Sequence, residues 1–187
     1  MKSYCLCLFF LASGLFSYSQ EKINWINWDQ MIQERENDSI KKKVFIDLFT
    51  SWCGWCKRMD GSTFSDRTIV NYMNSKYYCV KFDAETKDTI VFNGHQFINS
   101  DPSFVKSTNS SRGKSHWFAH SILDGKLSYP SYVILDENLT RLMIYKGFKD
   151  TEKLLGILLF FASDQYKYYN NYLNEAWNKS LKNNSQN

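Results

Sequence analysis

The sequence predicts a three-layer α/β domain built on a mixed β-sheet. Its 187 residues suggest a single domain. Residues 25–84 alternate between helix-like and strand-like segments, which is typical of a βαβ unit. Residues 129–163 contain two strand-like runs and then a helix-like run, which is typical of an antiparallel strand pair with a covering helix. Together these patterns predict helices packed on both faces of one central sheet.

The first half of the chain contains the βαβ part of this pattern. In order, we expect a helix from about Trp28, a buried strand over 42–50, a helix over about 53–60, a second helix over 67–76 and a strand over 77–84. Asp66 precedes the helix over 67–76 and is placed to cap it.

The second half contains an insertion, the antiparallel pair and a helical end. Asn93 and Gly94 lie between two β-like runs within 89–99, which is a strong hairpin signal. The remaining expected elements are a polar mobile loop over 100–114, a helix over 115–123 capped by Ser115, strands over 129–137 and 141–147 with a turn at Glu137 and Asn138, a helix that Asp150 or Thr151 caps, and a helical tail over 165–187.

Residues 1–19 have the layout of a secretory signal peptide. One lysine precedes an apolar run of about a dozen residues, and Ser17, Tyr18 and Ser19 form a small-residue box that predicts cleavage before Gln20. An uncleaved membrane anchor is the alternative, although the run is shorter than the ~20 residues that cross a bilayer. We therefore expect a periplasmic or otherwise exported protein, membrane-tethered if the leader is retained.

This leader completes the predicted domain organisation. Residues 20–163 form the domain, with a hairpin-and-loop insertion at about 88–114, and residues 164–187 form a helical extension with a frayed tail. The formal net charge of +4 is mild and no segment concentrates lysine and arginine, which argues against a nucleic-acid partner. We interpret lysines 41–43 as a solvated helix end before a strand.

Cysteine usage points to redox chemistry rather than to a disulfide scaffold. Of five cysteines, Cys5 and Cys7 lie in the leader, so Cys53, Cys56 and Cys79 remain. Three is an odd number, and a domain of this size does not need disulfides to fold. Cys79 lies within a predicted strand and is interpreted as an inert buried thiol.

Cys53 is predicted to lie at the N-terminus of a helix. The unpaired N–H groups and the positive end of the helix dipole would lower the pKa of its thiol, and the thiolate is the attacking species. Cys56 lies one turn later on the same face, where it can attack a mixed disulfide formed at Cys53. The spacing therefore supplies a nucleophile and a resolving thiol.

Other interpretations of the two cysteines remain open at this stage. A purely structural Cys53–Cys56 bridge would close a very short loop and constrain the unfolded chain little. Zinc sites usually need four ligands, and this chain has one CxxC pair. A copper site could combine Cys53, Cys56 and a histidine, since soft thiolates suit Cu(I). The candidate further ligands are His95, His116, His120 and Cys79.

The segment "VFIDLFTSWCGWCK" resembles the strand–turn–helix of thioredoxin-like proteins. Further features strengthen the likeness, and they are Trp52 before the first cysteine, Lys57 after the second, Asp47 six residues before Cys53, Pro130 at a later strand and Gly147 after the next. The resemblance covers about residues 28–163. In its closest form it is similar to exported thioredoxin-like proteins of Bacteroidetes-type bacteria and to the periplasmic reductase domain of thiol-disulfide interchange proteins.

The resemblance implies a role for each matching residue. Cys53 matches the nucleophile, Cys56 the resolving thiol, and Asp47 a buried acid that helps to deprotonate it. Pro130 matches a cis-proline beside the active site. The backbone of Tyr129 would then pair with a substrate strand. The redox-active disulfide itself would be the only cofactor.

The sequence also departs from thioredoxin between the cysteines, where Trp55 replaces a proline. The reduction potential therefore cannot be carried over, because ~30 mV is worth about 1.4 kcal/mol. Trp55 adds exposed apolar surface, and Trp52 either joins it in a recognition rim or packs the motif.

The function predicted from these observations is an exported thiol-disulfide oxidoreductase, with reduction favoured over oxidation by Asp47 and by the resemblance. Its partners would be disulfide-containing exported proteins and a membrane thiol electron donor. A thioredoxin-fold copper-handling module is the alternative from another functional class. Substrates, potential and oligomeric state are not fixed by the sequence.

Overall fold

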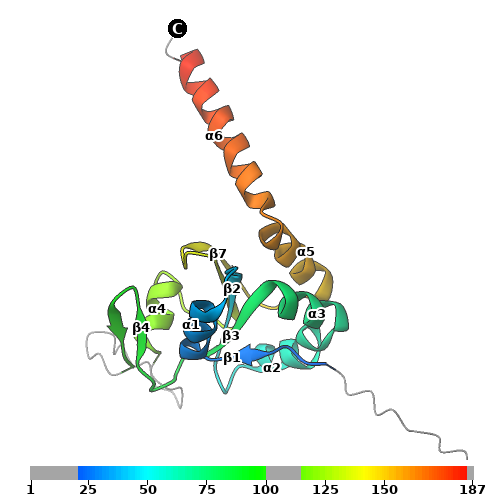
Figure 1. The fold of residues 1–187 in the computed structure, drawn as a ribbon, viewed down its shortest axis with the longest axis vertical. Coiled ribbons are helices and arrows are strands. Elements are labelled where there is room, and N and C mark those ends of the chain that lie inside the picture. The colour runs from blue at the N-terminus through cyan, green and yellow to red at the C-terminus, as the bar shows by residue number, and fades with distance from the viewer. Residues whose placement is uncertain (1–20, 100–114, 185–187) are drawn as a thin grey trace, which may run out of the picture.

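The structure is a computed structural model, and it describes residues 21–99 and 115–184. A five-stranded mixed sheet forms its centre, with strand order β1-β3-β2-β6-β7. The strands are β1 (Trp25–Ile26), β2 (Lys43–Phe49), β3 (Tyr77–Asp83), β6 (Ser131–Leu135) and β7 (Arg141–Lys146). β1 and β2 run parallel to β3, whereas β6 is antiparallel to β2 and to β7. The predicted α/β class on a mixed sheet is confirmed (Figure 1).

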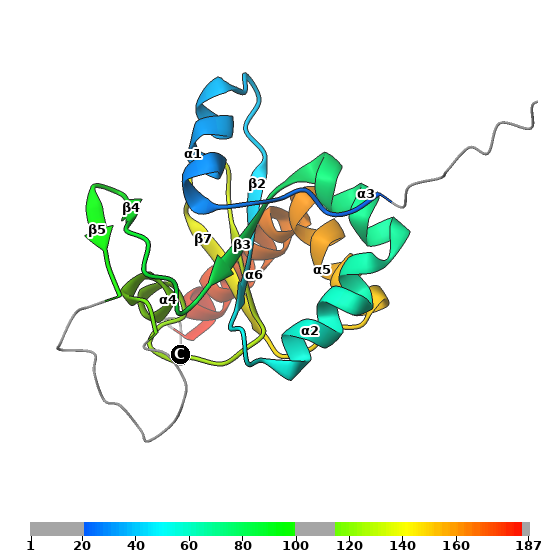
Figure 2. The ribbon, with the colours of Figure 1, turned by 90° about the horizontal axis from the view of Figure 1, so that it is seen from below.

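Helices cover both faces of the sheet, as Figure 2 shows. The elements over one face are α1 (Trp28–Asn37), α4 (Trp117–Ile122) and a hairpin of β4 (Ile90–Phe92) and β5 (His95–Phe97). The elements over the other face are α2 (Gly54–Gly61), the short 3-10 helix η1 (Thr63–Ser65), α3 (Arg67–Lys76) and α5 (Thr151–Ala162). Each face has its own apolar core, so the domain has the three predicted layers.

Side-chain alternation along β2 decides which residues meet which layer. Val44, Ile46 and Leu48 enter the core under α1 and α4. Phe45 enters the opposite core, together with Met59 of α2. Because successive side chains of a strand point to opposite faces, Asp47 shares the face of Phe45 and therefore lies on the side of α2.

Side-chain caps explain where several helices begin. The carboxylate of Asp66 accepts hydrogen bonds from the N–H groups of Thr68 and Ile69 at the start of α3, as predicted. Asp150 caps α5. The predicted Ser115 cap of α4 is wrong, because the cap is His116, whose ring nitrogen accepts a hydrogen bond from the N–H of Phe118.

The hairpin of the predicted insertion is confirmed. Asn93 and Gly94 have φ angles of 49° and 75°, which is the conformation that an Asn-Gly hairpin turn requires. Phe92 and Phe97 pack against Phe118 of α4, so the hairpin extends the apolar core. The predicted mobile loop over 100–114 and the predicted signal peptide over 1–19 lie outside the described residues.

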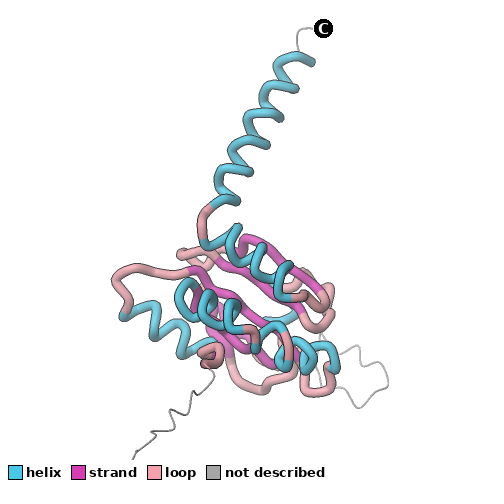
Figure 3. Tube along the Cα trace, turned by 90° about the vertical axis from the view of Figure 1, so that its right-hand side faces the viewer, coloured by secondary structure: helices cyan, strands magenta, loops and turns pink. Residues whose placement is uncertain are grey.

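The C-terminal helix α6 (Gln165–Asn184) leaves the domain as a separate rod (Figure 3). Tyr166 is buried against the domain, whereas residues 167–179 are exposed. The helical tail is thus confirmed over residues 165–184, while the predicted fray at 185–187 lies outside the described part. Within residues 21–99 and 115–184, no helix is both long enough and apolar enough to cross a bilayer.

Lys43 corrects one interpretation of the sequence. We expected lysines 41–43 to be solvated, but Lys43 is 4% exposed. Its ammonium group pairs with Glu137 at 2.6 Å and with Asp164 at 2.7 Å. These partners belong to the β6–β7 turn and to the link between α5 and α6, so one buried cation joins the start of β2 to the base of the C-terminal helix.

Candidate functional site

Cys53 and Cys56 lie where the sequence predicts, at the start of α2. They form a disulfide, and both residues are almost fully buried, with 4% and 3% exposure. Cys53 is the N-cap of α2, and its Sγ accepts a hydrogen bond from the N–H of Cys56 at 3.0 Å. A sulfur at the N-cap therefore receives one of the backbone donors that a helix start leaves without an internal partner.

Asp47 lies in the middle of β2 and is 1% exposed. Burial raises the pKa of its carboxyl group to about 6, although Lys81 acts in the opposite direction. Oδ2 pairs with the ammonium group of Lys81 at 2.7 Å, whereas Oδ1 has no hydrogen-bond partner among the described residues. A buried carboxyl group with a pKa near 6 can exchange a proton at physiological pH.

Lys81 is a site residue that the sequence reasoning missed. It lies directly opposite Asp47 in the pairing of β2 with β3, and it also pairs with Asp60 of α2. The aromatic rings around its ammonium group, with centroids at 4.9–5.3 Å, belong to Trp25, Phe49 and Phe64. The available signal was a lysine within the apolar, alternating run 77–84, which suggested a buried charge in need of a partner.

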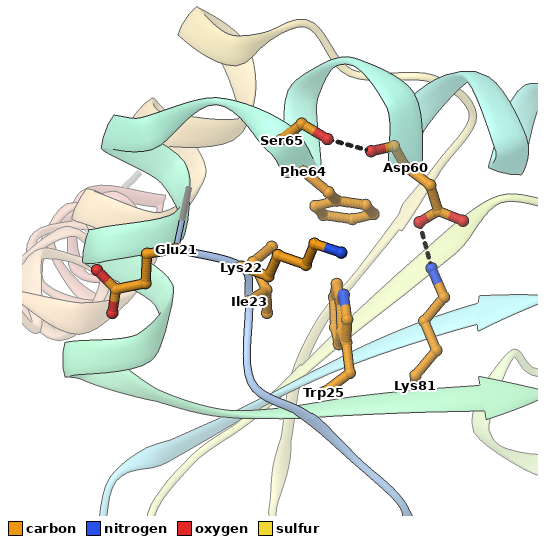
Figure 4. A pocket seen from close by; sticks show the side chains of 8 residues that line it. All are labelled: Glu21, Lys22, Ile23, Trp25, Asp60, Phe64, Ser65 and Lys81. Carbon is orange, nitrogen blue, oxygen red and sulfur yellow. Dashed lines mark hydrogen bonds and ion pairs between the residues drawn. The ribbon is translucent and has the colours of Figure 1, made fainter. Parts of the chain in front are cut away.

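A pocket of about 390 Å³ opens beside Lys81. Figure 4 shows the Lys81–Asp60 ion pair at one side of it, with the rings of Trp25 and Phe64 as walls. Glu21, Lys22 and Ile23, from the segment before β1, close the other side. The ion pair that holds Asp47 is therefore next to solvent, although Asp47 itself is buried.

A circuit of contacts joins three chain segments at the disulfide-containing turn. The Tyr129–Pro130 peptide bond is cis, as predicted. The ring of Trp52 contacts the ring of Tyr129. The N–H of Gly147 donates a hydrogen bond of 2.8 Å to the carbonyl of Pro130. The ring of Phe148, which follows Gly147, contacts the ring of Trp55. Trp52 precedes Cys53 and Trp55 lies between the two cysteines, so these contacts join the Tyr129–Pro130 segment and the Phe148 loop to residues next to the disulfide.

The two tryptophans of this circuit are both exposed, by 41% for Trp52 and by 55% for Trp55. The indole N–H of Trp52 donates to the carboxylate of Glu85 at 2.8 Å, and its ring meets Tyr129 edge-on at 6.1 Å. Trp52 therefore both packs against the site and contributes to its rim, so the two interpretations of this residue are compatible.

The histidines do not join the cysteines. His116 is fully buried, with one ring nitrogen accepting from Phe118 and the other 2.9 Å from the carbonyl oxygen of Asp88. His120 stacks on Trp117 in α4. Among the described residues, no three metal-ligating side chains are grouped to hold an ion, so the copper alternative gains no support.

Cys79 is buried in β3 and is the free cysteine of the described residues. Burial raises the pKa of its thiol to about 12. A thiol with so high a pKa is a poor nucleophile, which agrees with the prediction that Cys79 is inert.

The layered fold and the cysteine pair at the start of α2 define a thioredoxin-fold protein of the thiol-disulfide oxidoreductase type. Residues 11–105 match the Thioredox_DsbH family, described as a protein of unknown function, DUF255, and the chain belongs to that family.

Among related chains, the thiol:disulfide interchange protein DsbD of Campylobacter jejuni is 32% identical over 74 residues, which are 40% of this chain and 12% of that protein. Mouse spermatogenesis-associated protein 20 is 24% identical over 76 residues, 41% of this chain and 10% of that protein. The chain thus spans about a tenth of these relatives. A thioredoxin from Thermus thermophilus superposes with a TM-score of 0.51 and 11% identity, over 73% of this chain and 85% of that one, and it shows the shared fold.

Proposed function

We propose that this chain is an exported thiol-disulfide oxidoreductase that reduces disulfides of other exported proteins. The observation that carries the proposal is Cys53 at the N-cap of α2, with its sulfur accepting the N–H of Cys56. In the reduced protein, the same donor and the helix dipole would favour a thiolate at Cys53 over the neutral thiol.

The reaction proceeds in two exchange steps. The Cys53 thiolate attacks one sulfur of the client disulfide, so that a Cys53–client bond forms and the client S–S bond breaks, releasing one client thiolate. Cys56, once deprotonated, attacks Cys53 and releases the second client thiolate. The client gains two electrons, and the protein ends with the Cys53–Cys56 disulfide seen in the structure.

Asp47 would accept the proton of Cys56 in the second step. Its burial on the α2 face and its pKa of about 6 support this role. A base that activates the resolving thiol speeds release of the reduced client, which is the step that a reductase must complete. The backbone of Tyr129 beside Pro130 would pair with the client strand.

A dithiol donor must re-reduce the protein after each turnover. For an exported protein this donor would be a membrane thiol protein. The leader-like composition of residues 1–19 supports export, and the name of the Campylobacter jejuni relative supports thiol-disulfide interchange. The division into leader, domain 20–163 and extension 164–187 belongs to the same proposal.

Turnover of an insulin-like disulfide with a small dithiol as donor tests the activity. Full-length protein should accelerate the reduction, Cys53→Ser should abolish it, and Cys79→Ala should retain it as a control for loss of a cysteine. Equilibration of the Cys53–Cys56 pair with glutathione tests the direction, because a pair more reducing than glutathione is expected for a reductase. No acceleration by the full-length protein would exclude the activity.

A further inference from the structure

Arg58 lies on α2, three residues after Trp55, and its guanidinium group lies close to two aromatic rings. The carbon at the centre of its guanidinium group is 5.2 Å from the ring centroid of Trp55 and 5.4 Å from that of Phe148. The two rings are 5.8 Å apart. Both distances from the cation to a ring are within the range of cation–π attraction. The rings therefore fix the position of an exposed cation at the rim of the disulfide.

The hydrogen-bonding capacity of Arg58 is not used within the protein. Its side chain makes the two ring contacts but no hydrogen bond or ion pair to the described residues. A guanidinium group has five N–H donors in a planar fork that matches a carboxylate. Both rings lie on the same side of the guanidinium carbon, because they are 5.8 Å apart while that carbon is 5.2 Å and 5.4 Å from them, so the N–H donors on its other side are available to a ligand.

The Phe148 side of this cluster is held by backbone contacts. Gly147 donates its N–H to the carbonyl of Pro130 at 2.8 Å. The hydroxyl of Thr63 donates to the carbonyl of Lys149 at 2.7 Å, and the N–H of Lys149 contacts the sulfur of Met59 at 3.4 Å. The ring that supports Arg58 is thus tied both to α2 and to the cis-proline segment, so that binding there requires little further ordering.

The charge on this side of the disulfide is unbalanced. Lys57 is exposed next to Arg58 on α2. The nearby acids are already paired, Asp60 with Lys81 and Asp150 with Lys153. A client segment that carries a negative charge would therefore meet uncompensated positive charge, whereas a positively charged one would be repelled.

We propose that Arg58, positioned by Trp55 and Phe148, binds a carboxylate of the client segment, so that the protein prefers disulfides whose cysteine is flanked by aspartate or glutamate. This inference rests on the proposed oxidoreductase function and names its substrate class. An exposed arginine–carboxylate pair is worth up to about 1 kcal/mol. We therefore expect a preference of about five-fold for an acidic client over a neutral one.

The test isolates the first exchange step in full-length Cys56→Ser protein. The probes are short peptides whose single cysteine is joined to 2-thiopyridine, with glutamate, glutamine or lysine two residues from it. Cys53 attacks the peptide sulfur, the Cys53–peptide bond forms, and thiopyridone leaves with the electron pair and absorbs light. The second-order rate constant is expected to follow the order glutamate, glutamine, lysine.

Two variants in the same background assign the preference. Arg58→Gln should bring the glutamate and glutamine peptides to equal rates and leave the rate for the glutamine peptide close to that of the parent. Lys57→Gln is the matched control, because it removes one positive charge from the neighbouring position of the same helix and leaves the contacts of Arg58 with Trp55 and Phe148 in place. Most of the preference for the glutamate peptide should remain in this variant. Added salt should reduce the preference, since the pair is exposed.

The possible results distinguish a failure of the acidic-client inference from a failure of the proposed exchange activity. Equal rates for the three peptides, or a glutamate preference that survives in Arg58→Gln, would overturn the acidic-client inference and leave the exchange activity intact. A preference that disappears equally in Lys57→Gln would assign it to general charge and also overturn the role of Arg58. Failure of all three peptides to react would contradict the proposed function itself. Oxidised glutathione is assayed in parallel, because it is a small disulfide that carries carboxylates. Its rate shows whether the site prefers any small acidic disulfide or an acidic peptide.

Discussion

Asp47 combines burial with only partial neutralisation of its charge. Lys81 pairs with one carboxylate oxygen, but the other has no partner among the described residues. Burial outweighs the lysine, so the pKa rises from 3.8 to about 6. An ionised Asp47 therefore costs folding free energy near neutral pH, a cost that is expected of a group kept for proton transfer rather than for stability.

Replacing Asp47 by asparagine should stabilise the protein. Between pH 3.8 and about 6 the folded chain binds more protons at this position than the unfolded chain, so the free energy of unfolding falls as the pH rises through this window. At about pH 8, Asp47→Asn should raise that free energy by about 1–3 kcal/mol. Urea unfolding at several pH values measures it. A less stable variant at about pH 8 would contradict the assigned burial cost.

The pH dependence of turnover should report the same carboxyl group. Wild-type turnover is expected to rise as the pH passes about 6. In Lys81→Met, the cation that lowers the pKa of Asp47 is lost, so the rise should move to higher pH. Asp47→Asn should lack the rise and lose turnover near neutral pH. Identical profiles for the three proteins would show that Asp47 does not carry the proton.

Residue types and spacing were enough to predict Cys53 and Cys56 at the start of a helix, and the resemblance to thioredoxin-like proteins pointed to a buried Asp47, because all three residues lie within one strand–turn–helix. Lys81 was missed because its pairing with Asp47 depends on the register of two strands 34 residues apart in the chain. Arg58 was missed for a related reason. Its contact with Phe148, which follows the edge strand β7, depends on how the sheet and α2 pack together.

At the scale of elements, helix starts depend on a few polar caps. Asp66 lies ten residues after Cys56 and accepts two backbone N–H groups at the start of α3, a helix that supplies none of the contacts described around the disulfide. Asp66→Ala should therefore lower the free energy of unfolding by about 0.5–2 kcal/mol. Turnover at a temperature well below the unfolding transition should not change. Denaturant unfolding with a parallel activity assay tests this, and a large loss of activity without loss of stability would contradict it.

Elements with strong local patterns were predicted well, and those defined by tertiary contact were not. The Asn93–Gly94 turn and the runs of β2 and β3 carry their own signals. β1 has two residues and exists because it pairs with β3. His116 displaced Ser115 as the cap of α4 because its imidazole also contacts Asp88 from a distant loop.

At the scale of the whole molecule, we expect the layered domain to supply most of the free energy of unfolding and the projecting helix α6 to supply little. The two cores lie on the two faces of the sheet, and Tyr166 is the last residue of the chain in either of them. A chain that ends after Lys167 keeps Tyr166 and both ion pairs of Asp164. Its free energy of unfolding should change by no more than about 0.5 kcal/mol.

Thermal unfolding of this truncated protein, with turnover as a second readout, measures the contribution of α6. A loss of several kcal/mol would mean that α6 packs against the domain or against another chain in solution. The matched control is Lys43→Met, which leaves Glu137 and Asp164 without their shared cation and should destabilise the domain although α6 is intact.

The overall architecture could be predicted because periodicity, turn signals and one motif agree with each other. The ion pairs that join distant segments could not, since they follow from the assembled layers. Lys43 and Asp164 lie 121 positions apart and meet only after the sheet and α5 have formed. The same holds for the circuit around the disulfide, which draws on three separate segments.

The central claim is that Cys53 attacks and Cys56 resolves. Intact-protein mass spectrometry after mixing with a disulfide-bonded peptide tests it most directly. Cys56→Ser should accumulate a stable adduct of one peptide on Cys53, because nothing releases it. Cys53→Ser should form none, since Cys56 lies within the first turn of α2 rather than at its N-cap, and so lacks the N–H contact that favours a thiolate at Cys53. An adduct on Cys53→Ser, or none on Cys56→Ser, would contradict the account.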